Sequence, residues 1–182
     1  MNRLVTVICV VFMVGFAAAQ APTSGNAFFG YSYENSKLTV DRASLNGWEG
    51  SLEGKIFPHV GIVADFSEHY GSPSSPNSFC VNNNLCGPVG LSHELDVMFG
   101  PRVSVSVGRW KPFGQILVGV AHATGATDFR NNFSFASAFG GGLDYRIARP
   151  VAWRFQGDYV RTSLYSFTQN DFRFSTGIVL RF

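Results

Sequence analysis

Charged residues are scarce in this sequence. Only 14% of its 182 residues are Asp, Glu, Lys or Arg, whereas about 25% is usual in soluble domains. Aromatic residues reach 15%, a composition that excludes an intrinsically disordered tail and a charged coiled coil. The formal net charge is only +2 and no run of Lys or Arg is present, so we expect no nucleic-acid partner.

Long hydrophobic runs are absent after the first nineteen residues. Residues 1–19 begin with one cation, Arg3, continue as an apolar stretch and end in three alanines. This layout predicts a secretory signal peptide that is cleaved before Gln20. The alternative, a membrane-spanning helix, needs about 20 apolar residues, more than this stretch offers. We therefore predict an exported protein, with a short lead over residues 20–26 before its folded domain.

Cysteine is also rare, with three in the chain. Cys9 lies in the predicted signal peptide, which leaves Cys80 and Cys86 in a segment, residues 71–90, crowded with Ser, Pro, Asn and Gly. In an exported protein we expect these two to form a disulfide within a long loop. Zinc would need four ligands, and no His or carboxylate stands close to this pair. The sequence thus predicts neither a metal site nor a cofactor.

The remaining sequence alternates with a period of two, and helical spacing is nowhere sustained. Trp48 and Leu52 share one parity, whereas Glu49 and Glu53 share the other. A β-strand points successive side chains to opposite faces, so such a strand has an apolar face and a polar face. The same pattern predicts eight strands, over residues 27–34, 45–57, 60–70, 91–107, 112–122, 133–147, 151–162 and 172–182.

The connections between these strands alternate in length. They are long after the first, third, fifth and seventh strands, over residues 35–44, 71–90, 123–132 and 163–171. The other connections are short, and this alternation is typical of outer-membrane barrels. We predict an all-β fold over residues 27–182: an eight-stranded antiparallel up-and-down transmembrane β-barrel with short periplasmic turns and longer extracellular loops.

The apolar parity carries too many rings to point inward. An eight-stranded barrel has room inside for side chains or one small ligand. We therefore expect the rings to face lipid, where a mid-membrane Arg or Lys would cost about 2–4 kcal/mol. Rings on the apolar parity include Phe29, Tyr31, Trp48, Phe66, Phe99, Phe135, Phe139, Trp153, Phe155, Tyr159, Phe172, Phe174 and Phe182.

The opposite parity carries most of the charge and would line the lumen. Buried charges must be paired or hydrated, so we predict an ion-paired interior and not an open aqueous pore. Besides Glu34, the predicted network contains Glu49, Glu53, Lys55, Asp65, Glu94, Asp96, Asp144, Arg146, Arg154, Asp158, Arg173 and Arg181.

The last eight residues resemble the C-terminal signal that outer-membrane barrels present to the barrel assembly machinery. The matching positions are the polar Ser175, then Gly177, the apolar Leu180 and the terminal aromatic Phe182. Together with the alternation, this makes the chain similar to the small eight-stranded barrels of the outer membrane protein A and opacity-protein kind. The resemblance implies a bacterial outer-membrane location, contact with outer-membrane lipids and with the assembly machinery, and a monomer.

Some outer-membrane barrels of this size are enzymes, so the histidines need weighing. His93 stands between Ser92 and Glu94, but neighbours in a strand point to opposite faces and cannot form a triad. The same holds for His69 beside Glu68. We expect no catalytic residue and a structural or surface-recognition role, with an unidentified extracellular ligand bound through the loops. The alternatives are a small porin-like channel and an outer-membrane lipid-modifying enzyme.

Overall fold

The computed structural model describes residues 24–38, 41–71, 78–80, 86–88, 91–125, 132–164 and 167–182. Among these residues no helix has the length and apolarity needed to cross a membrane. Two short strands, β4 (Ser78–Cys80) and β5 (Cys86–Pro88), form a separate two-stranded sheet. The others form one closed barrel: β1 (Gly25–Leu38), β2 (Asp41–Lys55), β3 (Val60–Tyr70), β6 (Leu91–Ser104), β7 (Trp110–Gly125), β8 (Asn132–Arg146), β9 (Val151–Leu164) and β10 (Phe167–Arg181).

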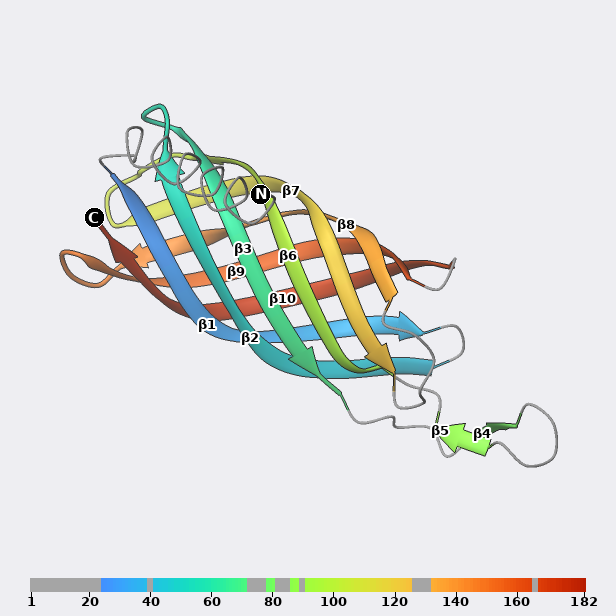
Figure 1. The fold of residues 1–182 in the computed structure, drawn as a ribbon. Helices are drawn as coiled ribbons and strands as arrows, with labels where there is room; N and C mark the ends of the chain where they lie inside the picture. The colour runs from blue at the N-terminus through green and yellow to red at the C-terminus, as the bar shows by residue number, and fades with distance from the viewer. Residues whose placement is uncertain are drawn as a thin grey trace, which may run out of the picture.

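The barrel closes where its first and last strands meet. Around the ring the order is β1, β10, β9, β8, β7, β6, β3 and β2, and all neighbours are antiparallel (Figure 1). At this seam the Gly25 amide donates to the Phe182 carbonyl oxygen at 2.9 Å, and the Phe182 amide donates to the Gly25 carbonyl oxygen at 3.2 Å. The eight-stranded up-and-down barrel predicted from the alternation is confirmed.

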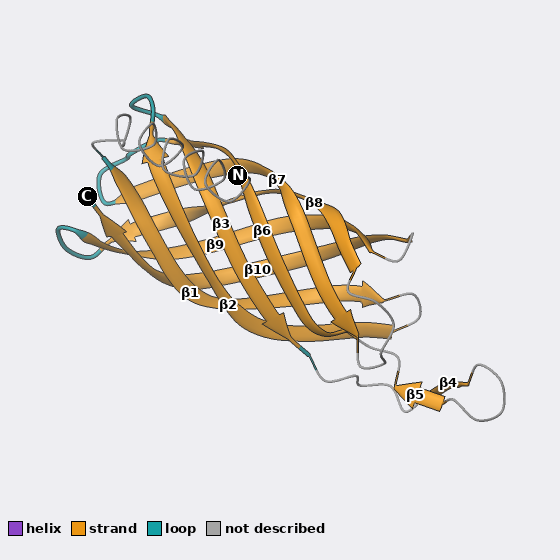
Figure 2. Cartoon of the chain, in the orientation of Figure 1, coloured by secondary structure: helices purple, strands orange, loops and turns teal. Residues whose placement is uncertain are grey.

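The two ends of the barrel differ, as Figure 2 shows. At one end lie the chain termini of the barrel and three short connections, over residues 56–59, 105–109 and 147–150, which we call the turn end. At the opposite end, the loop end, the sheet of β4 and β5 lies beyond the barrel rim.

Three connections at the loop end were predicted wrongly as loops throughout. The β1–β2 ladder continues to the pair Leu38 and Asp41, and the β9–β10 ladder to Leu164 and Phe167. The segment of residues 71–90 contains β4 and β5. The apolar alternation marks only the part of a strand that faces lipid, whereas main-chain hydrogen bonds can extend a hairpin of polar residues beyond it.

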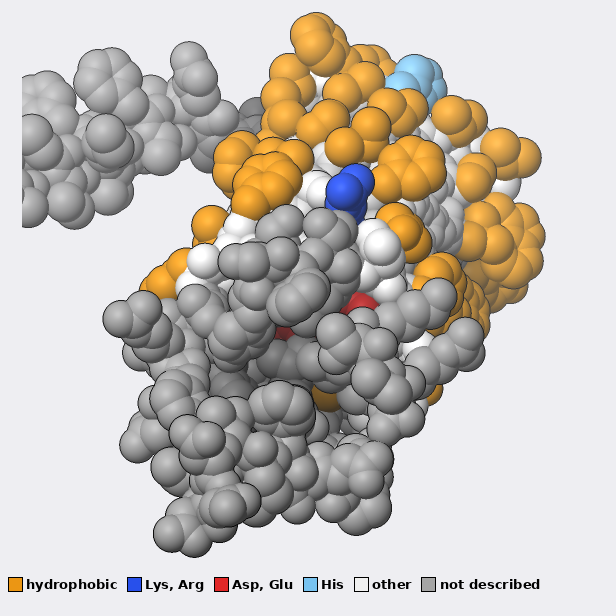
Figure 3. All heavy atoms as spheres, turned by 90° about the vertical axis from the view of Figure 1, so that its right-hand side faces the viewer, with side chains coloured by type: hydrophobic (Ala, Val, Ile, Leu, Met, Phe, Trp, Pro, Cys, Tyr) orange, Lys and Arg blue, Asp and Glu red, His pale blue; other side chains and the backbone are white. Residues whose placement is uncertain are grey.

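The aromatic rings of the apolar parity point away from the barrel axis. Trp153 and Phe174 are 37% and 41% exposed, so the predicted outward orientation of the apolar parity is confirmed. Figure 3, which looks toward the loop end, shows hydrophobic side chains over much of the described outer surface. On the outer surface Glu68 has two partners: His93 Nε2 lies 2.6 Å from Glu68 Oε1, and Trp48 Nε1 donates to Glu68 Oε2 at 2.9 Å.

Pro101, which lies within β6, interrupts one ladder only. It pairs in register with Ile62 of β3, but the β6–β7 register passes directly from Phe99–Val118 to Arg102–Gln115. The missing proline N–H therefore falls on the side where the ladder is already broken. A Cβ on the preceding Gly100 would lie 2.0 Å from the Ile116 carbonyl oxygen, so glycine permits the close approach of β7.

Gly30 and Gly177 face each other across the β1–β10 seam. A Cβ placed on Gly177 would lie 2.3 Å from the Gly30 Cα and 2.3 Å from the Phe29 carbonyl oxygen. These contacts are with backbone atoms, which cannot rotate aside as a flexible side chain can. The glycine of the predicted assembly signal is therefore required by the closed seam itself.

We expect Gly177→Ala to lower the free energy of unfolding by about 1–3 kcal/mol, because the added methyl forces the two strands apart. Gly50→Ala is the matched control, since a Cβ there meets nothing closer than 3.6 Å. Its effect should stay within about 0.5 kcal/mol. Urea unfolding of both variants, refolded in detergent without assembly factors, measures the difference. Equal destabilisation would contradict the role of the seam.

Candidate functional site: the charged lumen

The strand register places a polar side chain from every strand inside the barrel. Inward positions alternate with the lipid-facing ones, so each strand contributes every second residue to the lumen. Three arginines there, Arg102, Arg154 and Arg173, have 0% exposure. Burial of such charges is tolerated only when they are paired and hydrogen-bonded. The polar side chains of the lumen form three clusters along the barrel, and these arginines belong to two of them.

The turn-side cluster lies nearest the chain termini of the barrel. Arg154 donates from Nε to Asp144 Oδ1 at 2.7 Å and from Nη2 to Asp144 Oδ2 at 3.1 Å, a bidentate pair. Glu53 accepts from Lys55 Nζ at 2.6 Å and from Arg102 Nη1 at 3.3 Å. The cluster consists of Asn26, Glu53, Lys55, Arg102, Asp144, Arg154 and Arg181.

Two of these arginines also stack on aromatic rings inside the lumen. The guanidinium carbons of Arg102 and Arg154 lie 4.4 Å and 4.6 Å from the centroid of the Phe113 ring. Arg154 additionally lies 4.9 Å from the centroid of Phe28. Such cation–π contacts are favourable where water is excluded. The turn-side cluster therefore fills the barrel with packed rings and guanidiniums as well as ion pairs.

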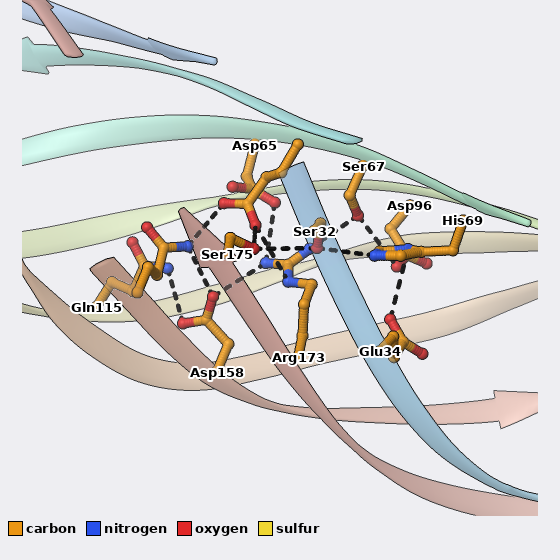
Figure 4. A network of polar contacts seen from close by, with 12 residues as sticks. Ser32, Glu34, Asp65, Ser67, His69, Asp96, Gln115, Asp158, Arg173 and Ser175 are labelled. Atoms are coloured by element: carbon orange, nitrogen blue, oxygen red, sulfur yellow. Dashed lines mark hydrogen bonds and ion pairs between the residues drawn. The ribbon is translucent and has the colours of Figure 1, made fainter. Parts of the chain in front are cut away.

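Arg173 organises the central cluster, which Figure 4 shows from close by. From β10 its guanidinium lies 3.1 Å from Asp65 on β3, 3.2 Å from Asp158 on β9 and 3.5 Å from Glu49 on β2. It also donates to Ser67 Oγ at 2.8 Å. One cation thus joins strands on opposite parts of the ring and partly compensates three buried carboxylates.

Two glutamines connect these groups into a continuous network. Gln156 Nε2 donates to Glu49 Oε1 and Asp158 Oδ2, both at 2.7 Å. Gln115 Nε2 donates to Asp158 Oδ1 at 2.9 Å, and Gln115 Oε1 accepts from Arg102 Nε at 2.9 Å. The hydrogen bonds of the central cluster therefore continue into the turn-side cluster.

The loop-side cluster has a different chemistry. It consists of Glu34 on β1, His69 on β3, and Glu94 and Asp96 on β6, all buried. His69 Nε2 lies 2.8 Å from Ser32 Oγ, and Nδ1 lies 3.5 Å from Glu34 Oε2. Within the described part of the chain no Lys or Arg forms an ion pair with any of the three carboxylates.

The structure corrects the predicted network at three residues. Arg146 is exposed and donates to the Gly108 carbonyl oxygen at 3.1 Å, because it stands at the end of β8 where the turn begins. Glu94 and Asp96 are buried in the lumen as predicted, yet neither forms an ion pair among the described residues; Ser67 donates to Asp96 at 3.4 Å. Glu34, also predicted in the lumen, lies in the loop-side cluster beside His69. The nine remaining predicted network residues lie in the turn-side and central clusters.

Several lumen residues were missed by the sequence analysis. Extending the inward parity of β6 past Met98 reaches Arg102, and extending that of β3 past Ser67 reaches His69, so a stricter use of the same signal would find both. Gln115 and Gln156 were not predicted as network members, because the prediction considered only charged side chains. Ser175, predicted as part of an assembly signal, also hydrogen-bonds to Glu49 inside the lumen.

Other predicted features concern residues that the structure describes incompletely. The signal peptide lies outside the described residues. The backbones of Cys80 and Cys86 are register partners in β4 and β5, while their side chains lie outside the description, so the disulfide stays a prediction. Leu180 and Phe182 are both exposed near the turn end of the barrel. Their part in an assembly signal also stays a prediction.

Comparison with known proteins extends the structural result. No family model matches this sequence, and no curated protein sequence matches it. Among solved structures, Neisserial surface protein A has a TM-score of 0.68 at 9% identity, over 87% of this chain and 97% of that one.

Two further structures are similar. The attachment invasion locus protein Ail of Yersinia pestis, in complex with the heparin analogue sucrose octasulfate, has a TM-score of 0.57 at 14% identity, over 87% of this chain and 98% of that one. The N-terminal β-barrel domain of Pseudomonas aeruginosa OprF has a TM-score of 0.57 at 13% identity, over 90% of this chain and all of that one. The chain therefore has the fold of the small eight-stranded β-barrels of bacterial outer membranes.

Proposed function

We propose that this protein is an integral outer-membrane barrel with a closed lumen, whose role at the cell surface is structural or in recognition through its loops. The outward rings and the fold shared with known outer-membrane barrels support the location. Export with cleavage of residues 1–19, contact with the barrel assembly machinery and a monomeric state belong to the same proposal. The residues that would choose a ligand lie in the connections of the loop end.

The single observation that carries a closed lumen is the network around Arg173. This side chain, together with Gln115 and Gln156, connects carboxylates on β2, β3 and β9 across the barrel interior. A hydrated ion would have to break several charge-assisted hydrogen bonds to pass, and each broken one leaves a buried charge without its partner. We infer that the lumen is a packed core of polar groups that stabilises the barrel, and not an ion-conducting pore.

Conductance in planar lipid bilayers tests this proposal. The refolded protein should give no large, steady channel, because the central cluster fills the lumen. Folding is checked on the same sample by gel mobility, where a closed barrel migrates anomalously until it is boiled. A steady conductance comparable to that of a general porin, from protein with the heat-sensitive mobility, would favour the alternative of a channel.

An enzyme is the second candidate, and one observation favours it. Ser32, His69 and Glu34 stand in the order of a nucleophile, a base and an orienting carboxylate. All three are fully buried, however, and the Ser32 hydroxyl is also engaged with Ser175, so no substrate reaches it in this structure. Labelling of the wild-type protein, but not of Ser32→Ala, by a fluorophosphonate would favour a hydrolase over our proposal.

A further inference from the structure

The loop-side cluster brings metal-ligating atoms together from three strands. One ligand atom each from Glu34, His69 and Asp96 can be chosen so that all lie within 4.8 Å of one another, and the three side chains have 0% exposure. Figure 4 shows the carboxylates of Glu34 and Asp96 close to the His69 ring. These residues are 35 and 27 positions apart in sequence, and only the strand register unites them.

Most carboxylate oxygens of this cluster have no hydrogen-bond partner among the described residues. Neither carboxylate oxygen of Glu34 accepts a hydrogen bond within the described residues, and the same is true of Asp96 Oδ1 and of both oxygens of Glu94, the register partner of His69. The buried guanidinium of Arg173 is already engaged by the central cluster. Among the described residues these buried carboxylates have no cation of their own, and burying them in this state carries a large desolvation penalty that a bound cation would relieve.

The hydrogen bonds around His69 indicate where that cation would sit. Ser175 Oγ donates to Ser32 Oγ at 3.0 Å and also hydrogen-bonds to Glu49, and Ser32 Oγ lies 2.8 Å from His69 Nε2. A histidine that binds a metal ion through Nδ1 has its hydrogen on Nε2, and Ser32 Oγ is placed to accept it. The lone pair of Nδ1 would then lie on the side of Glu34, whose Oε2 is 3.5 Å away.

We propose that Glu34, His69 and Asp96 bind a divalent transition-metal ion of the Zn²⁺ or Mn²⁺ type inside the lumen. An imidazole ligand excludes Mg²⁺ and Ca²⁺, which take oxygen ligands, and carboxylates do not suit soft Cu⁺. The 3.5 Å between Nδ1 and Glu34 Oε2 matches the separation of about 3.4 Å for tetrahedral ligands at bonds of about 2.1 Å. Ser32, bonded to the other ring nitrogen, is the outer partner that such histidine ligands usually have.

This inference goes beyond the proposed function and departs from the expectation of no metal. A bound ion would join β1, β3 and β6 directly beneath the connections that leave the barrel at the loop end. It would also neutralise charge that the described side chains leave uncompensated. The lumen would then hold two kinds of cross-link, guanidinium–carboxylate pairs toward the turn end and one metal ion toward the loop end.

Titration of the refolded, chelator-stripped barrel with ZnCl₂ tests the proposal, with calorimetry or a chromophoric chelator as the readout. We expect one Zn²⁺ per barrel, and Ca²⁺ binding at least tenfold weaker. His69→Gln and Glu34→Gln should each weaken Zn²⁺ binding by tenfold or more. The control is His93→Gln, which removes the histidine of the outer Glu68–His93 pair and should change nothing.

A second readout keeps the proposal falsifiable if binding is hard to measure. Zn²⁺ should raise the unfolding midpoint of the wild-type barrel but not that of Glu34→Gln. Without metal, Glu34→Gln should be at least as stable as wild type, because it removes an uncompensated buried charge. No stoichiometric binding by the wild type, binding unchanged in His69→Gln, or failure of Glu34→Gln to fold would each overturn the proposal.

Discussion

Replacing Arg173 with methionine should destabilise the folded barrel by about 3–5 kcal/mol, the usual result of removing one partner from a buried ion pair. The side chain has 0% exposure and contacts Asp65, Asp158 and Glu49, so its loss leaves three carboxylates in a water-poor interior without their cation. Methionine keeps much of the volume, so the effect reports charge more than a cavity. Urea unfolding in detergent or lipid vesicles, followed by tryptophan fluorescence, measures it.

Two further variants separate charge from general damage. Arg146→Met removes an arginine that is exposed and bonded to a backbone carbonyl, and should shift the free energy of unfolding by no more than about 0.5 kcal/mol. Adding Asp65→Asn and Asp158→Asn to Arg173→Met should restore part of the lost stability, because each removes an unpaired charge. If the triple variant is no more stable than Arg173→Met, the ion-pair explanation of the central cluster fails.

Ile116→Arg should cost about 2–4 kcal/mol of folding free energy in lipid bilayers, the range for a cation at mid-membrane on a barrel's outer face. Ile116 is 55% exposed, lies in the middle of β7 and faces Phe139 of β8 in register. The arginine would have to reach an interface along a surface of apolar side chains. Folding equilibria in vesicles of defined chain length, read by gel mobility, measure the loss.

The same substitution at Ile147 is the matched control. Ile147 is 58% exposed but lies in the 147–150 connection at the turn end, where headgroups and water can hydrate the cation. A change of about 0–1 kcal/mol is expected there. If Ile116→Arg and Ile147→Arg have equal effects, the outward apolar surface does not face hydrocarbon, and the membrane assignment itself is wrong.

The strands and their inward residues could be predicted from the sequence because a barrel in lipid imposes a strict rule on every second residue. The alternation alone was enough to place Glu49, Glu53 and Asp65 in the lumen, where all three are buried. Parity does not say where a strand ends, so Arg146 was counted inside although it lies at the start of a turn. The same limit hid the hairpin extension to Leu38 and Asp41, where polar residues no longer alternate with apolar ones.

The partners within the lumen could not be predicted. Whether Arg173 meets Asp65 or Asp96 depends on the stagger between strands that are not neighbours, which no local pattern records. The loop-side cluster illustrates this, because Glu34 and His69 come from strands separated in the ring by β2. The two glutamines of the central cluster could not be predicted either, since an amide side chain is as common on a polar surface as inside a hydrogen-bond network.

The β1–β10 seam has a consequence for how the chain reaches its native state. A barrel with this order has no stable fragment in hydrocarbon, since removing any strand exposes two rows of unpaired amides and carbonyls. The barrel closes only when β1 pairs with β10. The hydrogen bonds between Gly25 and Phe182 at the rim join the first and last strands of the chain. Insertion should therefore be all-or-none, and the rate should depend on how quickly the two extremes of the polypeptide find each other.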